Sequence, residues 1–303
     1  MNYYELRLQH HLEDFAVDLL QDDLASLGFE SFETEDGVFK AYAPAKEYEA
    51  RKAEIDALLE PITEIESRED ELIPDQDWNA VWESQYEPVR FGDFCFVHAP
   101  FHTPLKEVRY NIEIEPKMSF GTAHHPTTSL MIRFLEENPP QGESVLDMGC
   151  GTAVLGILAA MQGAVSVDCI DIDEWAYRNA AENAVRNGFP ALVYPEGSVQ
   201  NIGALSERPS SIVPDVRFRV FQGDAALLEG GRFDRIMANI NRNILLRDMS
   251  HYADCLQNGG LLYLSGFYLQ DMEMLEQECN AHRLFYRRHL ASDAWVAMEF
   301  IKK

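Results

Sequence analysis

The sequence feature that most constrains this chain is the stretch of residues 144–153, in which a short apolar run ends abruptly at two glycines. An apolar run of this length with a β-branched residue is typical of a buried strand. From about residue 153 to 163, apolar side chains recur at helical spacing, which predicts a helix. A strand, a tight glycine turn and a helix in this order open a βαβ nucleotide-binding unit.

The spacing of the glycines separates two classes of cofactor. Gly149 and Gly151 are followed three positions later by Val154, where a dinucleotide fingerprint requires another glycine. An acid, Asp147, stands two positions before the first glycine, and the next predicted strand ends in Asp171, where a carboxylate can hold a ribose diol. A cofactor with a cationic head and no phosphates suits this pattern better. The pattern resembles the first motif of the Rossmann-like methyltransferases, whose cofactor is S-adenosyl-L-methionine.

Length and cysteine content limit the class of protein. A chain of 303 residues with 46% hydrophobic residues is long enough for two domains with separate cores. Its five cysteines are scattered and never form a C-x-x-C pair, which favours reduced thiols over a disulfide framework or a zinc site. The sequence has no window apolar enough to span a bilayer and no signal-peptide pattern at its N-terminus. We therefore expect a cytoplasmic protein without a metal site or a membrane partner.

The charge of the chain is strongly negative and unevenly distributed. The net charge is −26, and residues 1–87 hold 24 acidic residues against 6 basic ones. Such a field repels phosphate backbones and attracts basic partners, although solubility alone accounts for the overall charge about as well. Because the charge is concentrated in one third of the chain, we expect a basic protein partner and no direct nucleic-acid binding.

The pattern along the chain predicts two domains. Residues 1–66 follow the order β-α-β-β-α-β, with an Asp-Gly hairpin signal at 36–37, which is typical of a small α+β domain of the ferredoxin-like type. Residues 67–90 are acidic and lack periodicity, so we interpret them as a linker. In residues 91–303 strands alternate with helices, which predicts an α/β fold with a doubly wound, mainly parallel sheet. Within it, residues 192–214 are rich in Gly, Pro and Ser and are expected to form an exposed insertion loop.

A second motif precedes the glycine turn. Residues 120–128 read F-G-T-A-H-H-P-T-T and lead into an apolar helix. Proline and hydroxyl side chains at a helix start favour a capped N-terminus, whose backbone N–H groups can hold polar groups of a ligand. Together with the glycine motif, the acidic N-terminal region and Ala-Asn-Ile at 238–240, this string closely resembles the bacterial ribosomal protein L11 methyltransferases, the PrmA family.

The resemblance implies an enzyme that uses S-adenosyl-L-methionine to methylate lysine side chains and the N-terminal amine of a basic ribosomal protein. It also implies a Rossmann-like sheet whose last strand is antiparallel. By the family's pattern, one pocket would hold the cofactor-binding residues Thr128, Gly149, Asp171, Asn239, Asp147, Gly151 and Phe120. Two positions depart from that pattern, because Ala123 and Ala153 stand where the family commonly has glycine. The predicted insertion is also longer than is usual in the family.

Methyl transfer to an amine needs no metal, but it needs an unprotonated amine in line with the donor at about 3–3.5 Å. A lysine with a pKa near 10.4 is neutral in roughly one molecule in a few thousand at pH 7, and partial desolvation lowers that pKa. Asn239, at the end of a predicted strand, is the best candidate for a catalytic side chain that orients the amine or the cofactor. His124 and His125 could relay protons, and neither is assigned as a base.

Two other functions remain open on the sequence. One is a methyltransferase that acts on a small molecule or on RNA, although the acidity disfavours RNA. The other is a nicotinamide-dependent oxidoreductase or a non-catalytic nucleotide-binding module, which the missing third glycine disfavours. Residues 1–66 contain no catalytic motif, so we expect this domain to recognise the substrate.

Overall fold

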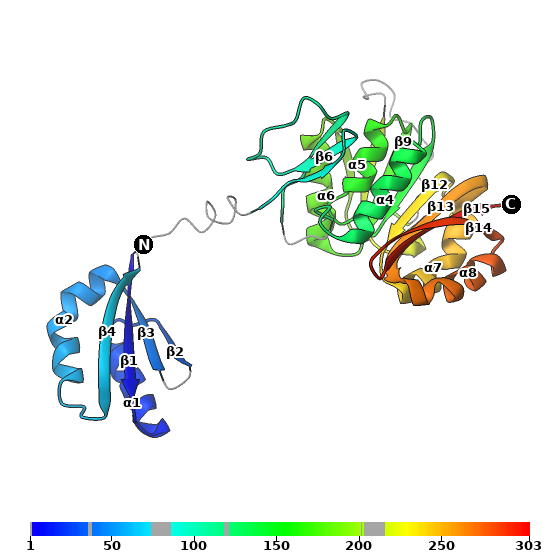
Figure 1. The fold of residues 1–303 in the computed structure, drawn as a ribbon. Helices are drawn as coiled ribbons and strands as arrows, with labels where there is room; N and C mark the ends of the chain where they lie inside the picture. Colours follow the sequence, from blue (N-terminus) through cyan, green and yellow to red (C-terminus); the bar gives the residue numbers. More distant parts are fainter. Residues whose placement is uncertain (1, 36–37, 74–85, 118–120, 201, 203–215) are drawn as a thin grey trace. The chain divides into compact units, whose positions relative to one another are not determined.

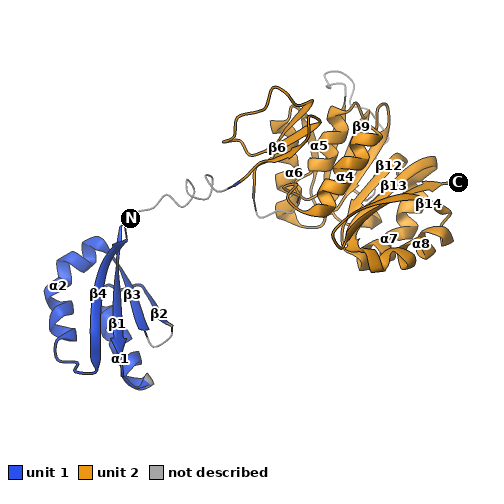
Figure 2. Cartoon of the chain, viewed as in Figure 1, with its two compact units in different colours: residues 1–86 blue, residues 87–303 orange. Residues whose placement is uncertain are grey.

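The computed structural model of the chain describes residues 2–35, 38–73, 86–117, 121–200, 202 and 216–303. They form two compact units, residues 1–86 and residues 87–303 (Figure 1, Figure 2). The predicted hairpin turn at 36–37, the predicted pocket residue Phe120 and most of the predicted insertion lie outside the described residues.

The first unit is a four-stranded sheet with two helices. Its elements are β1 (Tyr3–His10), α1 (Asp14–Ser26), β2 (Ser31–Glu35), β3 (Val38–Pro44), α2 (Ala45–Leu59) and β4 (Ile65–Ile73). The strands are antiparallel in the order β2-β3-β1-β4. Alternate side chains such as Leu6 and Leu8 of β1 share one core with Leu24 of α1 and Ile55 of α2, so both helices cover the same face. This order and layering agree with the predicted ferredoxin-like fold.

Part of the segment that we expected to be a linker, residues 67–90, is a strand. Residues 67–73 continue β4, which pairs with β1 up to Ile73. β4 is an edge strand, and most of its side chains are exposed. Its sequence can therefore be rich in charged residues and lacks the apolar alternation that predicts a strand. At the other end of the segment, residues 89 and 90 belong to β5.

The second unit contains two sheets. A small sheet comprises β5 (Val89–Phe91), β6 (Cys95–His98) and β7 (Tyr110–Glu113). The large sheet has eight strands, β8 (Ser144–Met148), β9 (Ser166–Asp171), β10 (Ala191–Tyr194), β11 (Arg217–Gln222), β12 (Phe233–Asn239), β13 (Leu256–Tyr268), β14 (Leu284–Ser292) and β15 (Trp295–Lys302). The helices are α4 (Pro126–Glu137), α5 (Val154–Met161), α6 (Glu174–Arg186), α7 (Arg242–Cys255) and α8 (Met272–Ala281).

The order of the large sheet determines where a ligand can bind. The strands run β10-β11-β9-β8-β12-β13-β15-β14. The pairs from β10 to β13 are parallel, and β15 and β14 are antiparallel to their neighbours. The chain moves outward from β8 first through β9 and later through β12, so the strand order reverses beside β8. A crevice outside the carboxyl ends of the strands at such a reversal is the usual ligand site of doubly wound sheets. The predicted α/β class and antiparallel last strand are confirmed.

Helices cover both faces of the large sheet (Figure 1). One core cluster contains buried residues of α4, α5 and α6, including Phe134, Ile157 and Ala180. The other contains buried residues of α7 and α8, including Met249 and Leu275. These two cores fix the strand ends against each other, so side chains at the carboxyl edge of the sheet are held on a rigid frame.

The beginning of the predicted insertion, residues 192–214, belongs to the fold. Residues 191–194 form β10, the edge strand beside β11, and Tyr194 stacks on Phe221 with ring centroids 4.7 Å apart. Ile202 is 5% exposed and belongs to the core under α7. A four-residue edge strand is too short to give a clear alternation of apolar and polar residues, which explains why the sequence pattern missed it.

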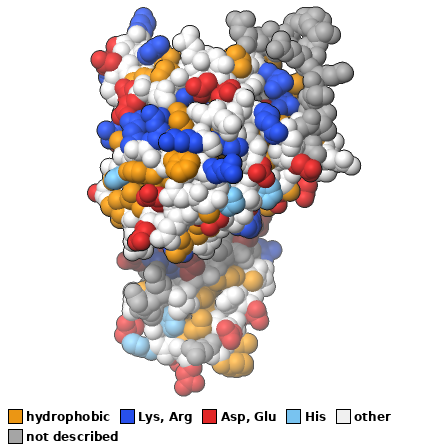
Figure 3. Space-filling view, turned by 90° about the vertical axis from the view of Figure 1, so that its right-hand side faces the viewer, with side chains coloured by type: hydrophobic (Ala, Val, Ile, Leu, Met, Phe, Trp, Pro, Cys, Tyr) orange, Lys and Arg blue, Asp and Glu red, His pale blue; other side chains and the backbone are white. Residues whose placement is uncertain are grey.

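Charged side chains are divided between the units. Residues 1–87 contain 6 of the 25 Lys and Arg residues. The remaining ones lie in the larger unit, and Figure 3 shows several groups of them on the face in view. All five cysteines are buried and free. In the part of the chain that the structure describes, no helix is long and apolar enough to cross a membrane, and no three His, Cys, Asp or Glu side chains are grouped as metal ligands.

Candidate functional site

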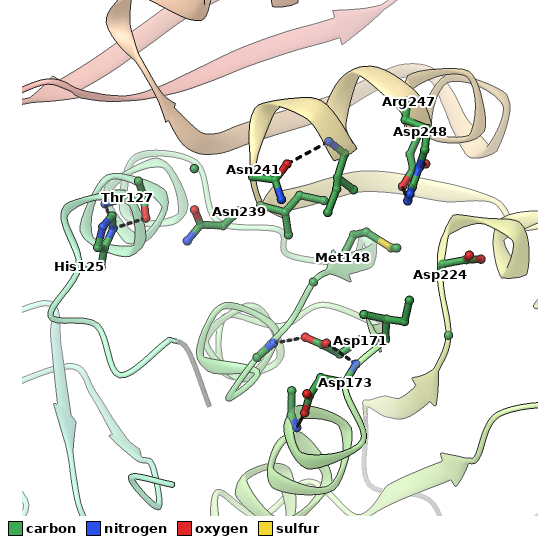
Figure 4. A pocket seen from close by; sticks show the side chains of 18 of the residues that line it. His125, Thr127, Met148, Asp171, Asp173, Asp224, Asn239, Asn241, Arg247 and Asp248 are labelled. Atoms are coloured by element: carbon green, nitrogen blue, oxygen red, sulfur yellow. Dashed lines mark hydrogen bonds and ion pairs between the residues drawn. The ribbon is translucent and has the colours of Figure 1, made fainter. Parts of the chain in front are cut away.

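A pocket of about 520 Å³ opens at the carboxyl ends of the parallel strands. The described residues that line it all belong to the larger unit: His125, Thr127, Met148, Gly149, Gly151, Asp171, Ile172, Asp173, Ala176, Gly223, Asp224, Asn239, Ile240, Asn241, Ile244, Arg247, Asp248, Gly266 and Trp295. Figure 4 shows two ends, with His125, Thr127 and Asn239 at one and Asp224, Arg247 and Asp248 at the other. The pocket therefore lies at the reversal of the strand order.

The glycine turn after β8 forms part of the pocket wall. Gly149 has φ +67° and Gly151 has φ +55°, a backbone region that favours residues without a Cβ atom. A Cβ atom on Gly149 would lie 2.1 Å from Cγ2 of Ile240. The left-handed backbone therefore favours glycine at both positions, and at Gly149 the close approach of Ile240 is a second reason.

Asp171, the last residue of β9, is fixed by the turn. One carboxylate oxygen accepts a hydrogen bond from the Gly151 N–H at 2.9 Å, and the other accepts one from the Asp173 N–H at 3.0 Å. Burial raises the pKa of the Asp171 carboxyl, although these backbone donors oppose the shift. Each carboxylate oxygen can accept more than one hydrogen bond, so this side chain can also accept hydrogen bonds from two neighbouring hydroxyls of a ligand.

Asp147 lies beneath the turn and is not among the residues that line the pocket. It is 2% exposed and accepts a hydrogen bond from the Gly156 N–H at 2.9 Å, in the first turn of α5. Burial raises the pKa of its carboxyl to about 7. The side chain thus supports the start of α5, and its charge state is coupled to the stability of the unit.

Asn239 ends β12 and lines the pocket. Its Nδ2 donates to Oγ1 of Thr128 at 3.3 Å. Its Oδ1 is buried and finds no hydrogen-bond partner among the described residues. Thr128 itself is 1% exposed and does not line the pocket, so its hydroxyl orients the amide. A buried acceptor without a partner costs free energy unless a ligand supplies a donor.

The end of the pocket near Asn239 has an aromatic wall. The rings of His125 and Trp295 meet edge to face with centroids 4.6 Å apart, and Tyr268 packs on Trp295 at 4.3 Å. His125 Nδ1 accepts a hydrogen bond from the Thr127 N–H, which caps α4. We assign the proton of a neutral His125 ring to Nε2 for this reason.

His124 does not line the pocket. Its two ring nitrogens contact Oγ1 of Thr122 at 3.0 Å and the carbonyl oxygen of Glu87 at 2.8 Å. These contacts give it a structural role between the segment before β5 and the segment before α4.

The other end of the pocket is acidic. Asp173 and Asp224 each cap the helix that follows them, by accepting hydrogen bonds from Ala176 N–H and Ala226 N–H at 2.9 Å. Asp248 pairs with Arg247 through two hydrogen bonds of 2.6 and 3.0 Å. Together with Asp171, the described lining contains four carboxylates and one guanidinium. This excess of negative charge favours a cationic ligand.

Sequence reasoning missed several of these residues. Asp224 follows the end of β11 as Asp171 ends β9, so the rule that strand ends share one edge would have found it. Trp295 and His125 are 170 positions apart in the sequence, and no local pattern joins them. Four of the predicted residues, Gly149, Gly151, Asp171 and Asn239, do line the pocket.

Ala123 and Ala153, the two departures from the resembled pattern, adopt glycine-like backbone angles. Their φ values are +68° and +62°, and both side chains are buried. An alanine in this region costs roughly 1–2 kcal/mol relative to right-handed backbone. The left-handed backbone explains why glycine is usual at both positions. In this chain the buried alanines adopt the same backbone conformation.

The sequence matches the family described as ribosomal protein L11 methyltransferase (PrmA) over residues 18–303. It is 39% identical to the ribosomal protein L11 methyltransferase of Bacteroides fragilis, over 99% of this chain and 100% of that protein. The protein of the same name from Porphyromonas gingivalis is 40% identical over 98% of this chain and 96% of its own length. The fold is similar to the crystal structure of a ribosomal protein L11 methylase from Lactobacillus delbrueckii subsp. bulgaricus, with a TM-score of 0.58, 23% identity, and coverage of 72% of this chain and 100% of that one.

Proposed function

Because this chain belongs to the ribosomal protein L11 methyltransferase (PrmA) family, we propose that it transfers methyl groups from S-adenosyl-L-methionine to amines of ribosomal protein L11. The acceptors would be lysine side chains and the N-terminal amine. Identity near 40% over the whole length of similarly named proteins supports this substrate. The observation in the structure that carries the proposal is the buried Oδ1 of Asn239 in the pocket lining, which has no hydrogen-bond partner among the described residues.

The pocket residues fit S-adenosyl-L-methionine. Asp171 can accept hydrogen bonds from the two ribose hydroxyls, and Gly149 and Gly151 line the pocket without side chains. The excess of carboxylates in the lining favours a positively charged ligand. A dinucleotide fits less well, because Val154, buried at the start of α5, stands where a pyrophosphate turn needs glycine.

Bound S-adenosyl-L-methionine supplies a methyl group on a positively charged sulfur, which an amine lone pair can attack directly. The chain must then present the amine unprotonated and in line, at about 3–3.5 Å. We assign Asn239 this task. Its free Oδ1 can accept an N–H of the amine while Nδ2 stays on Thr128, so the amide fixes the direction of the lone pair.

The aromatic wall supports binding of the acceptor amine at the end of the pocket beside Asn239. The rings of His125 and Trp295 form an aromatic boundary of the pocket there. Partial desolvation by such a boundary disfavours the ammonium form and lowers the pKa of a lysine. The proton that the amine loses can leave to solvent, so the geometry requires no protein base and we assign none to His125.

We assign recognition of the substrate to the first unit. Its sequence is acidic, and ribosomal proteins are generally basic, so opposite charge favours their association. Among the residues that the structure describes, those that line the pocket come from the second unit, so we assign the first unit to binding the protein rather than to chemistry. A ribosomal protein substrate also supports action in the cytoplasm.

Two measurements test this function. Calorimetric titration should give binding of S-adenosyl-L-methionine and none of NAD, which separates a methyltransferase from an oxidoreductase. Incubation with methyl-labelled cofactor and the total ribosomal proteins and RNA of the organism should then label one protein band. Label in RNA, or in no macromolecule, would contradict the proposed substrate.

A further inference from the structure

Helix α1 of the first unit exposes a pair of large apolar side chains. Phe15 is 73% exposed and Leu19 is 50% exposed, one helical turn apart. The opposite side of the helix supplies Leu20 and Leu24, which are at most 4% exposed, to the core of the unit. The exposed pair therefore lies outside the core that holds the unit together. Among the described residues of this unit, the remaining exposed large apolar side chain is Leu72 of β4, at 44%.

The exposed pair is flanked by carboxylates. Helical spacing of three, four and seven residues puts Asp18 and Asp22 on the same stripe as Phe15 and Leu19, and both aspartates are exposed. The thirteen residues of α1 include no Lys or Arg. This stripe, Phe15, Asp18, Leu19 and Asp22, is here called the α1 stripe. It combines apolar anchors with uncompensated negative charge.

The open face of the sheet in the same unit is a weaker candidate for binding. Its tyrosine hydroxyls already donate to neighbouring carboxylates, Tyr3 to Glu30 at 3.0 Å and Tyr42 to Glu33 at 3.4 Å. These hydroxyls and carboxylates already satisfy each other, so a partner gains little by binding them. The α1 stripe offers apolar surface that gains free energy by being covered.

We propose that the α1 stripe is the docking surface for the protein substrate, and that it binds a basic segment carrying an apolar side chain beside its lysine or arginine residues. This inference rests on the proposed function, from which the basic partner comes. Phe15 is the anchor, because aromatic side chains at the centre of an interface carry a large share of the binding energy. Asp18 and Asp22 select a cationic segment.

Docking at this surface has a kinetic signature. The stripe holds the substrate outside the pocket, so it raises the local concentration of every acceptor amine without touching the reacting atoms. Loss of the stripe should therefore raise KM for the protein substrate and leave kcat and cofactor affinity unchanged. A single docking surface also allows one substrate to present several amines in turn.

The test uses the full chain and purified ribosomal protein L11. The double variant Phe15→Ala/Leu19→Ala should raise KM for the protein about tenfold or more, as expected for losing an interface anchor. Its matched control is Leu72→Ala, an exposed apolar residue of the same unit outside the stripe, which should leave KM unchanged. Asp18→Asn/Asp22→Asn should weaken the salt dependence of KM, whereas Glu49→Gln/Glu54→Gln on the exposed side of α2 should not.

Each outcome decides between the claims. An unchanged KM in Phe15→Ala/Leu19→Ala, with wild-type enzyme active on L11, overturns the docking surface and leaves the proposed function intact. If the wild-type enzyme binds the cofactor but methylates no ribosomal protein, the proposed function fails, and the docking surface fails with it. If sedimentation gives a wild-type dimer that the double variant dissociates, the stripe joins two copies of the chain and the proposal is wrong.

Discussion

Replacing Asp147 by asparagine should change how the stability of the protein depends on pH. The Asp147 carboxyl is 2% exposed, and burial raises its pKa to about 7 from an ordinary value of 3.8. Between these two values, the folded protein holds a proton that the unfolded chain has released. The free energy of unfolding therefore falls as pH rises through this window and stays low above it.

The size of the effect follows from the width of the window. Between pH 5 and pH 8, about two pH units lie below the raised pKa of Asp147. Over this range the free energy of unfolding of the wild type should therefore fall by about 3 kcal/mol because of this group. Asparagine does not titrate, and its amide oxygen can still accept the hydrogen bond from Gly156. The difference in stability between Asp147→Asn and wild type should therefore move in favour of the variant by about 3 kcal/mol over this range.

Urea denaturation of both proteins at pH 5, 6, 7 and 8, without cofactor, measures this difference directly. The unfolding midpoints give the free energies once the slopes with urea are shown to agree. Parallel pH curves for the two proteins would contradict this prediction, because they would mean that the buried carboxyl does not change its protonation on folding.

Three further predictions concern the pocket and the charge. Asp171→Ala should weaken S-adenosyl-L-methionine binding at least tenfold in calorimetry, since a charged acceptor contributes roughly 1.5–3 kcal/mol; unchanged affinity in a folded variant would exclude the ribose assignment. Gly149→Ala should lower the free energy of unfolding by about 2–4 kcal/mol, because the new methyl group meets Ile240 in a left-handed conformation; a wild-type thermal midpoint would contradict this. Raising salt from 0.1 M to 1 M shortens the Debye length from about 10 Å to about 3 Å, so kcat/KM for the protein substrate should fall while cofactor affinity changes much less; equal losses would argue against electrostatic capture by the first unit.

The glycine turn and the strand ends were predictable because local patterns define them. The turn at Gly149 and Gly151 is marked by an apolar run that stops, and Asp171 and Asn239 end predicted strands. In a parallel sheet these ends meet at one edge, and the structure does bring them to one pocket. Asp147 is different, because sequence position cannot tell a side chain that faces the pocket from one that lies beneath the turn.

The features that sequence patterns missed depend on edges and on distant contacts. β4 and β10 are edge strands. Because an edge strand pairs on one side only, a charged sequence such as β4 or a very short one such as β10 can form it. The contact of His125 with Trp295 joins the start of α4 to the start of β15, which requires the whole sheet to be assembled. The left-handed backbone at Ala153 is likewise visible only in the structure.

We propose that ribosomal protein L11 is methylated in the pocket beside Asn239. The most direct test is mass spectrometry of purified L11 after incubation with S-adenosyl-L-methionine and either the wild-type enzyme or Asn239→Ala. We predict mass increments of whole methyl groups on L11 with the wild type, and a rate at least tenfold lower with Asn239→Ala at saturating cofactor, since the amine loses its orienting acceptor. An unmodified L11 after incubation with wild-type enzyme that binds the cofactor would contradict the proposed function, and equal rates for the two enzymes would contradict the role of Asn239.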